Sequence, residues 1–168
     1  SRRYKVESLD KQFRTIIQRA DRYVRGKTYG CLFPGCKNMA IQSHAIPRAS
    51  SLKALADNGA VYTRNQSFSS MIKNTTVAAP VDVVEIGINN ASVFKGYCPE
   101  HDSRLFFSAE TTDPSKKHAM SVSLHLRAVS LEYCRKRQAI DFSRKVAELA
   151  SVSAFRSIAK ELADQGDR

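Results

Sequence analysis

The sequence predicts an α+β protein in which a small antiparallel β-sheet lies between an N-terminal helix and a C-terminal helical hairpin. Apolar residues recur at helical spacing near both ends of the 168-residue chain. β-Branched and aromatic residues gather between residues 60 and 95. Cysteine and histidine occur in two closely spaced pairs, Cys31 with Cys36 and Cys98 with His101. These pairs indicate a metal-bound core.

The first element is a helix from Leu9 to about Val24, followed by Gly26 and Gly30, which end it. Its apolar residues lie three and four positions apart and define one buried face. They are Leu9, Phe13, Ile16, Ile17, Ala20 and Val24. The opposite side is basic, so we expect this helix to present positive charge to solvent.

The middle of the chain begins with the turn from Cys31 to Cys36, in which Pro34 and Gly35 favour a tight knuckle. Residues 39–44 then predict a short strand that stops at Pro47, and residues 50–57 predict a helix ended by Asn58 and Gly59. The next segment predicts a small antiparallel sheet or hairpin. Its strand-forming residues are Val61, Tyr62, Thr63, Phe68, Val77, Val81, Val83, Val84, Ile86 and Ile88.

The last third of the chain predicts helices. Pro99 suits a first helical turn, so we expect a helix over residues 98–109 with Leu105 and Phe106 packed inward. After a break at residues 113–115, we expect two helices in a hairpin, broken near Gln138. The apolar stripe of the first is Val122, Leu126, Val129 and Tyr133, and that of the second is Phe142, Val146, Leu149, Phe155, Ile158 and Leu162. We expect two parts, a metal-bound domain over residues 1–112 and a helical extension over residues 113–168. Each apolar stripe of the extension needs a packing partner, either the metal-bound domain or another copy of the extension.

The two pairs of possible ligands predict a structural zinc site. Cys98 and His101 are one helical turn apart, and with Cys31 and Cys36 they supply the four N/S donors that tetrahedral Zn²⁺ prefers. His44 is an alternative fourth ligand, or a strand histidine bonded to backbone. We interpret the remaining candidates, Cys134, His118 and His125, as packing or surface residues. Residues 37–97 must then fold so that the second pair returns to the first.

Charge points to a polyanionic partner. The chain holds 27 Lys and Arg against 16 Asp and Glu, a formal net charge of +11, and nine basic residues fall within residues 1–27. A further basic run covers residues 135–137. Beside a zinc fold, such charge favours nucleic acid, although a solvated surface or an acidic protein partner fits the charge alone. No stretch is apolar enough to cross a membrane and no signal peptide precedes the first helix, so we expect an intracellular, cytoplasmic protein with reduced cysteines.

The order of these motifs resembles the HNH endonuclease family, which has a treble-clef, ββα-metal zinc fold. The matching residues are Cys31 and Cys36, the segment Ser43-His44-Ala45-Ile46-Pro47, and the segment Cys98-Pro99-Glu100-His101-Asp102. The resemblance covers about residues 30–108. It is divergent, because Ser43 stands where the family has an acidic residue and Asp102 where it has a histidine. Asn89 and Asn90 are the candidates for the family's middle asparagine.

The resemblance implies an endonuclease that hydrolyses DNA phosphodiester bonds. His44 would be the general base, Asp102 would bind a catalytic Mg²⁺ or Mn²⁺, and Ser43 would lie beside them. DNA is favoured over RNA, and the expected contacts to nucleic acid are Arg14, Arg22, Arg25, Lys27 and Arg104. The alternative interpretation of Asp102 is a first-turn acid favoured by the helix dipole.

Two other functions fit the same pattern. One is a zinc-binding module that binds DNA or RNA without cleaving it, which Ser43 favours. The other is a zinc-ordered interaction domain that forms homo-oligomers through its C-terminal helices.

Overall fold

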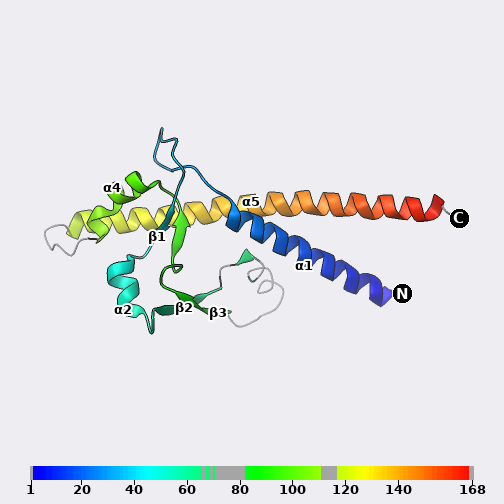
Figure 1. The fold of residues 1–168 in the computed structure, drawn as a ribbon, viewed down its shortest axis with the longest axis horizontal. Coiled ribbons are helices and arrows are strands. Elements are labelled where there is room, and N and C mark those ends of the chain that lie inside the picture. The colour runs from blue at the N-terminus through cyan, green and yellow to red at the C-terminus, as the bar shows by residue number, and fades with distance from the viewer. Residues whose placement is uncertain (1, 66, 69, 71–81, 111–116, 167–168) are drawn as a thin grey trace. The chain divides into compact units, whose positions relative to one another are not determined.

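A computed structural model describes residues 2–65, 67–68, 70, 82–110 and 117–166 of the chain (Figure 1). The fold is α+β, as predicted. Its long helices are α1 (Arg2–Gly26), α4 (Pro99–Glu110) and α5 (Lys117–Gly166), and its strands are β1 (Gln42–His44), β2 (Ala60–Arg64), β3 (Val83–Gly87) and β4 (Val93–Lys95). Of the predicted features, Val77, Val81 and the break at residues 113–115 lie outside the described residues. Within those residues, every helix is too short or too polar to cross a membrane.

The chain divides into two compact units. The first comprises Ser1–Lys27, Gln66–Ala79 and Gln138–Arg168, and the second comprises Thr28–Asn65 and Pro80–Arg137. The predicted boundary after residue 112 does not separate these units, because α5 contributes its first part to one and its second part to the other.

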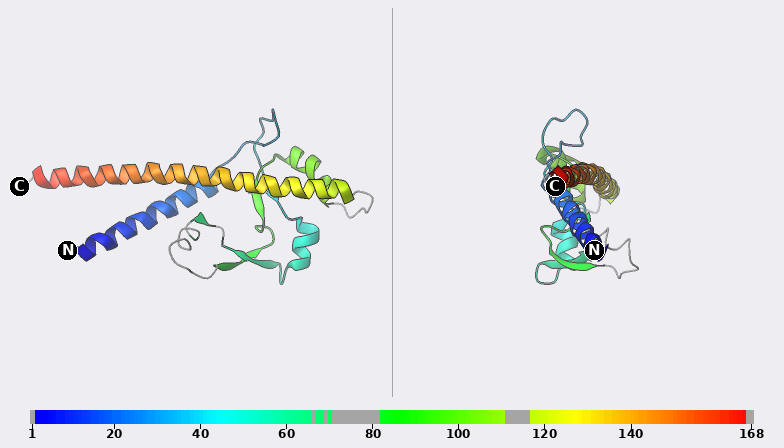
Figure 2. Two further views of the ribbon diagram at one scale, coloured as in Figure 1. Left: turned by 180° about the vertical axis from the view of Figure 1, so that it is seen from behind. Right: turned by 90° about the vertical axis from the view of Figure 1, so that its right-hand side faces the viewer.

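The predicted C-terminal hairpin is wrong. Residues 117–166 form one uninterrupted helix of 50 residues, drawn from yellow to red in Figures 1 and 2, and Gln138 lies within it. No proline occurs in this helix and its only glycine is the last residue, so the sequence contains no residue that would break it. Of the two apolar stripes, the second packs against α1 through Phe142, Val146 and Leu149.

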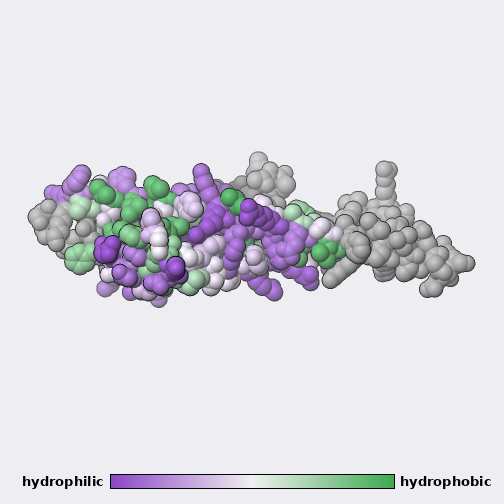
Figure 3. Space-filling model, turned by 90° about the horizontal axis from the view of Figure 1, so that it is seen from above, coloured by the Kyte–Doolittle hydropathy of each residue, from purple (hydrophilic) through white to green (hydrophobic). Residues whose placement is uncertain are grey.

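The first apolar stripe of α5 faces solvent in the described structure. Val122 is 55% exposed and Val129 is 67% exposed, with Leu126 and Tyr133 also exposed. Figure 3 shows one face of the molecule, on which hydrophobic residues stand among hydrophilic ones. The buried face of this part of α5 instead carries Ser123, Arg127, Ser130 and Cys134.

Polar contacts join this face of α5 to the other elements of the second unit. The Tyr97 and Ser130 hydroxyl groups lie 2.9 Å apart, and the Ser123 hydroxyl donates to the Leu105 carbonyl at 3.1 Å. Arg127 is 3% exposed, and its guanidinium pairs with Glu110 at 2.6 Å and lies 4.7 Å from the Phe106 ring centroid. Because the buried arginine has both a carboxylate and an aromatic face beside it, its charge is tolerated there.

The first unit joins α1 to the second part of α5. Ile17, Ala20 and Val24 of α1 form its core with Phe142 of α5, as the apolar period predicts. The Phe68 ring stacks on Phe142 with centroids 4.4 Å apart. The helix begins at Arg2, seven residues before the predicted start.

The second unit contains two separate two-stranded antiparallel sheets. One pairs β1 with β4, and the other pairs β2 with β3. The predicted strand over residues 39–44 is confined to residues 42–44, although Met39 forms an isolated bridge with Gly30. The predicted helix over residues 50–57 is instead a π-helix over Arg48–Leu52 followed by the short α2 (Lys53–Leu55).

The core of the second unit lies beside the β1–β4 pair. It is built from Phe94, Tyr97, Phe106 and Cys134, and Leu105 packs against it, as predicted for this helix face. Since β4 leads directly into α4, the sheet delivers the start of that helix to the turn between residues 31 and 36. This connection positions the site described next.

Candidate metal centre

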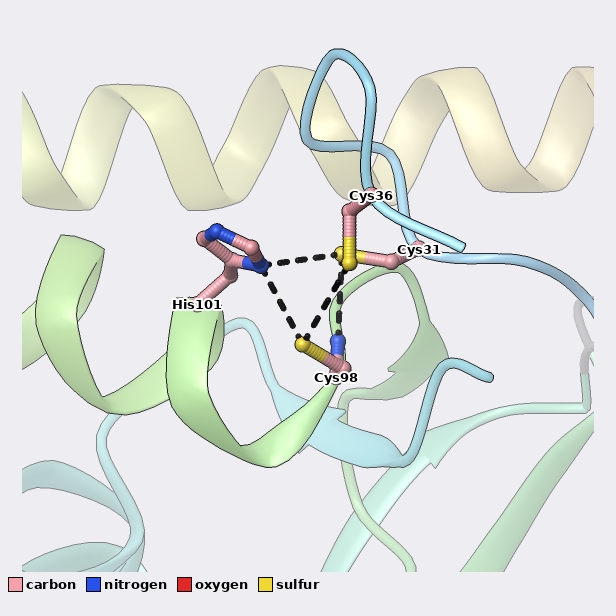
Figure 4. A group of neighbouring side chains, drawn as sticks. All are labelled: Cys31, Cys36, Cys98 and His101. Carbon is pink, nitrogen blue, oxygen red and sulfur yellow. Dashed lines mark hydrogen bonds between the residues drawn. The ribbon is translucent and has the colours of Figure 1, made fainter. Parts of the chain in front are cut away.

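Four side chains from two distant segments meet at one point. Cys31 and Cys36 come from the knuckle, and Cys98 and His101 come from the start of α4 (Figure 4). One ligand atom from each residue lies within 4.8 Å of all the others. These are the four residues that the sequence predicts as zinc ligands.

The knuckle is formed by backbone hydrogen bonds. The Cys36 N–H donates to the Phe33 carbonyl at 3.0 Å, and the Cys31 N–H donates to the Asn38 carbonyl at 2.9 Å. Gly35 adopts a φ of 75°, a conformation that other residues rarely adopt. The turn therefore directs both thiols to the same side.

Backbone contacts with the end of β4 bring the second pair of ligands to the knuckle. The Leu32 N–H donates to the Gly96 carbonyl and the Ile41 N–H donates to the Tyr97 carbonyl, both at 2.8 Å. Gly96 is required here, because an added Cβ would lie 2.5 Å from the Phe94 ring. This glycine was not singled out from the sequence, and only the three-dimensional approach of the Phe94 ring reveals its role.

The spacing of the donor atoms fits a tetrahedral metal ion. The His101 Nδ1 atom lies 3.2 Å from the Cys98 Sγ and 3.6 Å from the Cys31 Sγ, and the Cys36 and Cys98 Sγ atoms are 3.9 Å apart. Two sulfurs bound to tetrahedral Zn²⁺ at about 2.3 Å would lie about 3.8 Å from each other. Three thiols and one imidazole in this arrangement are compatible with a structural zinc site.

The imidazole of His101 is held by its surroundings. It is 8% exposed, and it stacks on the Phe33 ring with centroids 3.9 Å apart and planes 10° from parallel. The guanidinium of Arg104 also lies over the Phe33 ring, 5.4 Å from its centroid. Phe33 thus covers one side of the centre and links it to a residue predicted to contact nucleic acid.

The environment of the thiols favours a metal-ready thiolate at Cys98. The backbone N–H of His101 donates to this sulfur, and with the His101 side chain and the neighbouring thiols it outweighs burial and lowers the pKa of Cys98 to about 6. At Cys36 the backbone of Asn38 lowers the pKa, but burial and the thiols of Cys31 and Cys98 outweigh it, so the pKa is raised. The Cys98 thiolate therefore forms near neutral pH, whereas at Cys36 a bound cation would be needed to stabilise the thiolate.

His44 lies outside this cluster. Its Nε2 atom is 3.1 Å from the carbonyl oxygen of Ile88, so it matches the alternative of a strand histidine bonded to backbone. Among the described residues, the group that could hold a metal ion contains His101 and not His44. The choice of His101 as the fourth candidate ligand is thus consistent with the geometry.

Asp102 follows His101 in the first turn of α4, where its N–H donates to the Cys98 carbonyl at 2.8 Å. Its Oδ1 atom is buried and has no hydrogen-bond partner among the described residues. Ser43 is 3% exposed, pairs with Phe94 across the sheet, and likewise has a buried Oγ without a partner in the described part of the chain. Because successive residues of a strand point to opposite faces, Ser43 and His44 point in different directions.

The predicted nucleic-acid contacts differ in their environments. Arg14 and Arg22 are exposed on α1. Arg25 pairs with Asp21 at 2.8 Å. Lys27 pairs with Asp141, also at 2.8 Å. The charge of these last two is partly neutralised within the protein.

The two candidate asparagines form different hydrogen bonds. The Asn89 side-chain oxygen accepts a hydrogen bond from the Arg48 guanidinium at 2.8 Å, whereas Asn90 is exposed and its N–H donates to the Gly87 carbonyl. Arg48 was not predicted as a site residue. The sequence signal for it is its position, because Arg48 is a basic residue directly after the segment Ser43-His44-Ala45-Ile46-Pro47.

Comparison of the chain with protein-family models, with curated proteins and with solved structures found no match.

Proposed function

We propose that this protein is a zinc-stabilised endonuclease of the HNH type that hydrolyses DNA with the help of Mg²⁺ or Mn²⁺. The observation that carries the proposal is the meeting of Cys31, Cys36, Cys98 and His101 beside a strand that ends in His44. A knuckle, an antiparallel strand pair and a helix bearing the second ligand pair follow one another in the order of a treble-clef, ββα-metal core.

Zn²⁺ in this proposal has a structural role. Four protein ligands fill a tetrahedral ion and leave no open position for substrate. Binding would hold the knuckle to α4, two segments that lie more than 60 residues apart in sequence. A structural zinc ion of this kind contributes on the order of 10–16 kcal/mol to folding near neutral pH.

His44 is suited to act as the general base. A carbonyl oxygen only accepts hydrogen bonds, so the contact with Ile88 requires the proton on Nε2 and leaves a lone pair on Nδ1. A neutral imidazole held in this tautomer can accept a proton from water near neutral pH. The Ile88 carbonyl also fixes the orientation of the ring.

Asp102 is suited to hold the catalytic cation. Its unpartnered, buried Oδ1 atom is the kind of donor that a hard divalent cation prefers. When bound, such a cation stabilises the negative charge that develops on the phosphate. The position of Asp102, next to His101 in the first turn of α4, ties this carboxylate to the zinc centre.

DNA is the proposed substrate because of the charge of the chain. The net charge of +11 attracts a polyanion, and Arg14 and Arg22 of α1 are exposed to contact phosphates. Arg104, which lies on Phe33 beside the metal centre, would contact the backbone near the site of cleavage.

Nicking of supercoiled plasmid tests the proposal. Wild-type protein with Mg²⁺ or Mn²⁺ should convert the plasmid to the open circle, and His44→Ala should slow the conversion about 10²–10⁴-fold. His125→Ala is the matched control, because that histidine is exposed on α5 and its hydrogen bonds in the described structure are with Ser121 of its own helix. Undiminished nicking by His44→Ala, with unchanged zinc content, would reject His44 as the base.

The second candidate function is binding of nucleic acid without cleavage. The buried position of Ser43 favours it, since no acidic residue precedes His44 to help hold a catalytic cation. This function predicts salt-sensitive binding of DNA or RNA with no nicking by the wild-type protein in either metal.

A further inference from the structure

The chain after His44 is bonded to a second segment, residues 88–92, which carries the two candidate asparagines, Asn89 and Asn90. The Ala45 N–H donates to the Ser92 carbonyl at 2.9 Å, and the Ile46 N–H donates to the Ser92 hydroxyl at 3.2 Å. His44 contacts the Ile88 carbonyl, as described above. These bonds fix the loop that leaves β1 against the turn that enters β4.

The same two segments are joined once more by Arg48. Its Nη1 atom donates to the side-chain oxygen of Asn89 at 2.8 Å. The imidazole of His44 and the guanidinium of Arg48 are thus anchored to consecutive residues, Ile88 and Asn89, whose Cα atoms are about 3.8 Å apart. The two side chains therefore lie at one small region of the surface.

The backbone that carries Arg48 is also fixed. Pro47 is buried, and its carbonyl accepts hydrogen bonds from the N–H groups of Ser51 and Leu52, both at 3.1 Å. Leu52 is 3% exposed and anchors this helical turn in the protein. Arg48 is exposed at the start of the turn, so its guanidinium is positioned and still accessible.

The charge of Arg48 is not neutralised by its partner. Arg25, Arg127 and Arg135 each pair with a carboxylate. Within the described residues Arg48 forms no ion pair, and the Asn89 amide that orients it is neutral. An arginine held in place without a counterion matches the planar donor set that binds phosphate oxygens.

We propose that Arg48 binds the phosphate group that is attacked by the water molecule which His44 deprotonates. In this step the oxygen of water forms a bond to phosphorus, its proton passes to Nδ1 of His44, and the bond from phosphorus to the leaving sugar oxygen breaks. The inference rests on the proposed nuclease function and extends it by naming the residue that orients the phosphodiester. Asn89 holds the guanidinium in place and is a positioning residue. Donors aimed at the charge that develops in a transition state increase the rate more than they increase binding.

The test compares single-turnover nicking rates and DNA dissociation constants of Arg48 variants. Arg48→Gln should slow nicking about 10²–10³-fold, the usual effect of removing one such donor. Its DNA dissociation constant should change by less than about tenfold, since one phosphate contact among many is lost. Asn89→Ala, which keeps the charge and removes its anchor, should slow nicking about 10–100-fold.

Arg64→Gln provides the matched control, because Arg64 is an exposed arginine of the same unit on β2 and its loss changes the net charge equally. It should nick like the wild type. Arg48→Ala should regain activity when guanidinium ion is added at millimolar concentration, which a purely structural role would not produce.

Three outcomes are distinguishable. Wild-type nicking that Arg48→Gln and Arg48→Ala leave unchanged overturns the role of Arg48 and leaves the nuclease proposal standing. A rate loss in Arg48→Ala that guanidinium fails to restore, together with a lower melting temperature, assigns Arg48 a structural role and also overturns the inference. Absence of nicking by the wild type overturns the proposed function and, with it, this role of Arg48.

Discussion

Replacing Cys98 by serine tests whether the second unit depends on a metal ion. Cys98 is fully buried, contributes one of the four donor atoms, and also accepts the backbone N–H of His101. Serine keeps the size and a hydrogen-bonding atom but is a poor ligand for zinc, which prefers thiolate and imidazole in structural sites. The substitution therefore removes metal binding with little change in volume.

The expected loss of stability is large. Structural zinc contributes on the order of 10–16 kcal/mol near neutral pH. The net stability of a whole domain is about 5–15 kcal/mol. Loss of the ion should therefore unfold the second unit, whose core residues Phe94, Tyr97 and Phe106 lie within five residues of Cys98 or His101 in sequence.

Cys134→Ser is the matched control. Cys134 is 2% exposed and packs in the same core, but its thiol donates to the Lys95 carbonyl at 3.4 Å and lies outside the ligand cluster. A serine hydroxyl can make the same hydrogen bond, so the expected cost is about 1–3 kcal/mol with zinc retained. The two variants share burial and chemistry and differ in metal ligation.

Elemental analysis and thermal unfolding measured on the same samples decide the result. Wild type and Cys134→Ser should contain about one zinc per chain, and Cys98→Ser should contain little and lack the near-ultraviolet circular dichroism of packed tyrosine. Full zinc content and a wild-type melting temperature in Cys98→Ser would refute the ligand assignment.

Three further predictions concern acidity, the long helix and the core. Zinc affinity should fall as pH is lowered, because protons compete with zinc for the thiolates. The His101 N–H lowers the pKa of Cys98 to about 6, so below about pH 6 zinc binding must release about one more proton and the plot of log affinity against pH should become steeper by about one. Chelator competition measures this slope, and a slope that stays the same through pH 6 would contradict that pKa. Gln138→Pro should lower the free energy of unfolding by about 3 kcal/mol or more and reduce the helical circular dichroism relative to Gln138→Ala, because residue 138 lies inside α5. A hairpin with its turn at this residue would tolerate proline. Phe106→Ala should lower the urea midpoint by an amount equivalent to about 3–5 kcal/mol, while Phe107→Ala, at a 64% exposed neighbour, should have little effect; equal effects would contradict the assigned core face.

The sequence predicted the metal cluster because its signals are local. The Pro34-Gly35 turn and the i, i+3 spacing of Cys98 and His101 each specify the geometry of one ligand pair without reference to the rest of the fold. The buried face of α1 was also predictable, since Ile17 and Val24 follow a regular helical period. What the sequence left open was how the two ligand pairs meet, which depends on the contacts of residues 32 and 41 with residues 96 and 97.

The buried face in the first part of α5 could not be predicted from hydrophobicity. The apolar period predicts that Val122 and Val129 are buried, but the protein buries Ser123, Arg127 and Ser130. Each of these three residues contacts another element, Ser123 the Leu105 carbonyl, Arg127 the Glu110 carboxylate and Ser130 the Tyr97 hydroxyl, although the Nε atom of Arg127 has no hydrogen-bond partner among the described residues. Such pairs become visible only in three dimensions, because the partner is distant in sequence and the residue types alone indicate exposure.

The proposed catalytic groups depend on two different anchors. Asp102 is fixed through α4, whose first turn is attached to the metal centre by Cys98 and His101. His44 and Arg48 are fixed through hydrogen bonds to Ile88 and Asn89, which do not involve the metal ligands. Because His44, Arg48 and Asp102 all belong to the second unit, which should unfold when zinc is lost, both anchors should fail together. Nicking should then fall in proportion to the fraction of zinc-free chains, while the remaining activity keeps its Mg²⁺ dependence and its sensitivity to His44→Ala. A partly zinc-depleted preparation that needs more Mg²⁺ for nicking would show instead that the carboxylate of Asp102 can be displaced without unfolding of the unit.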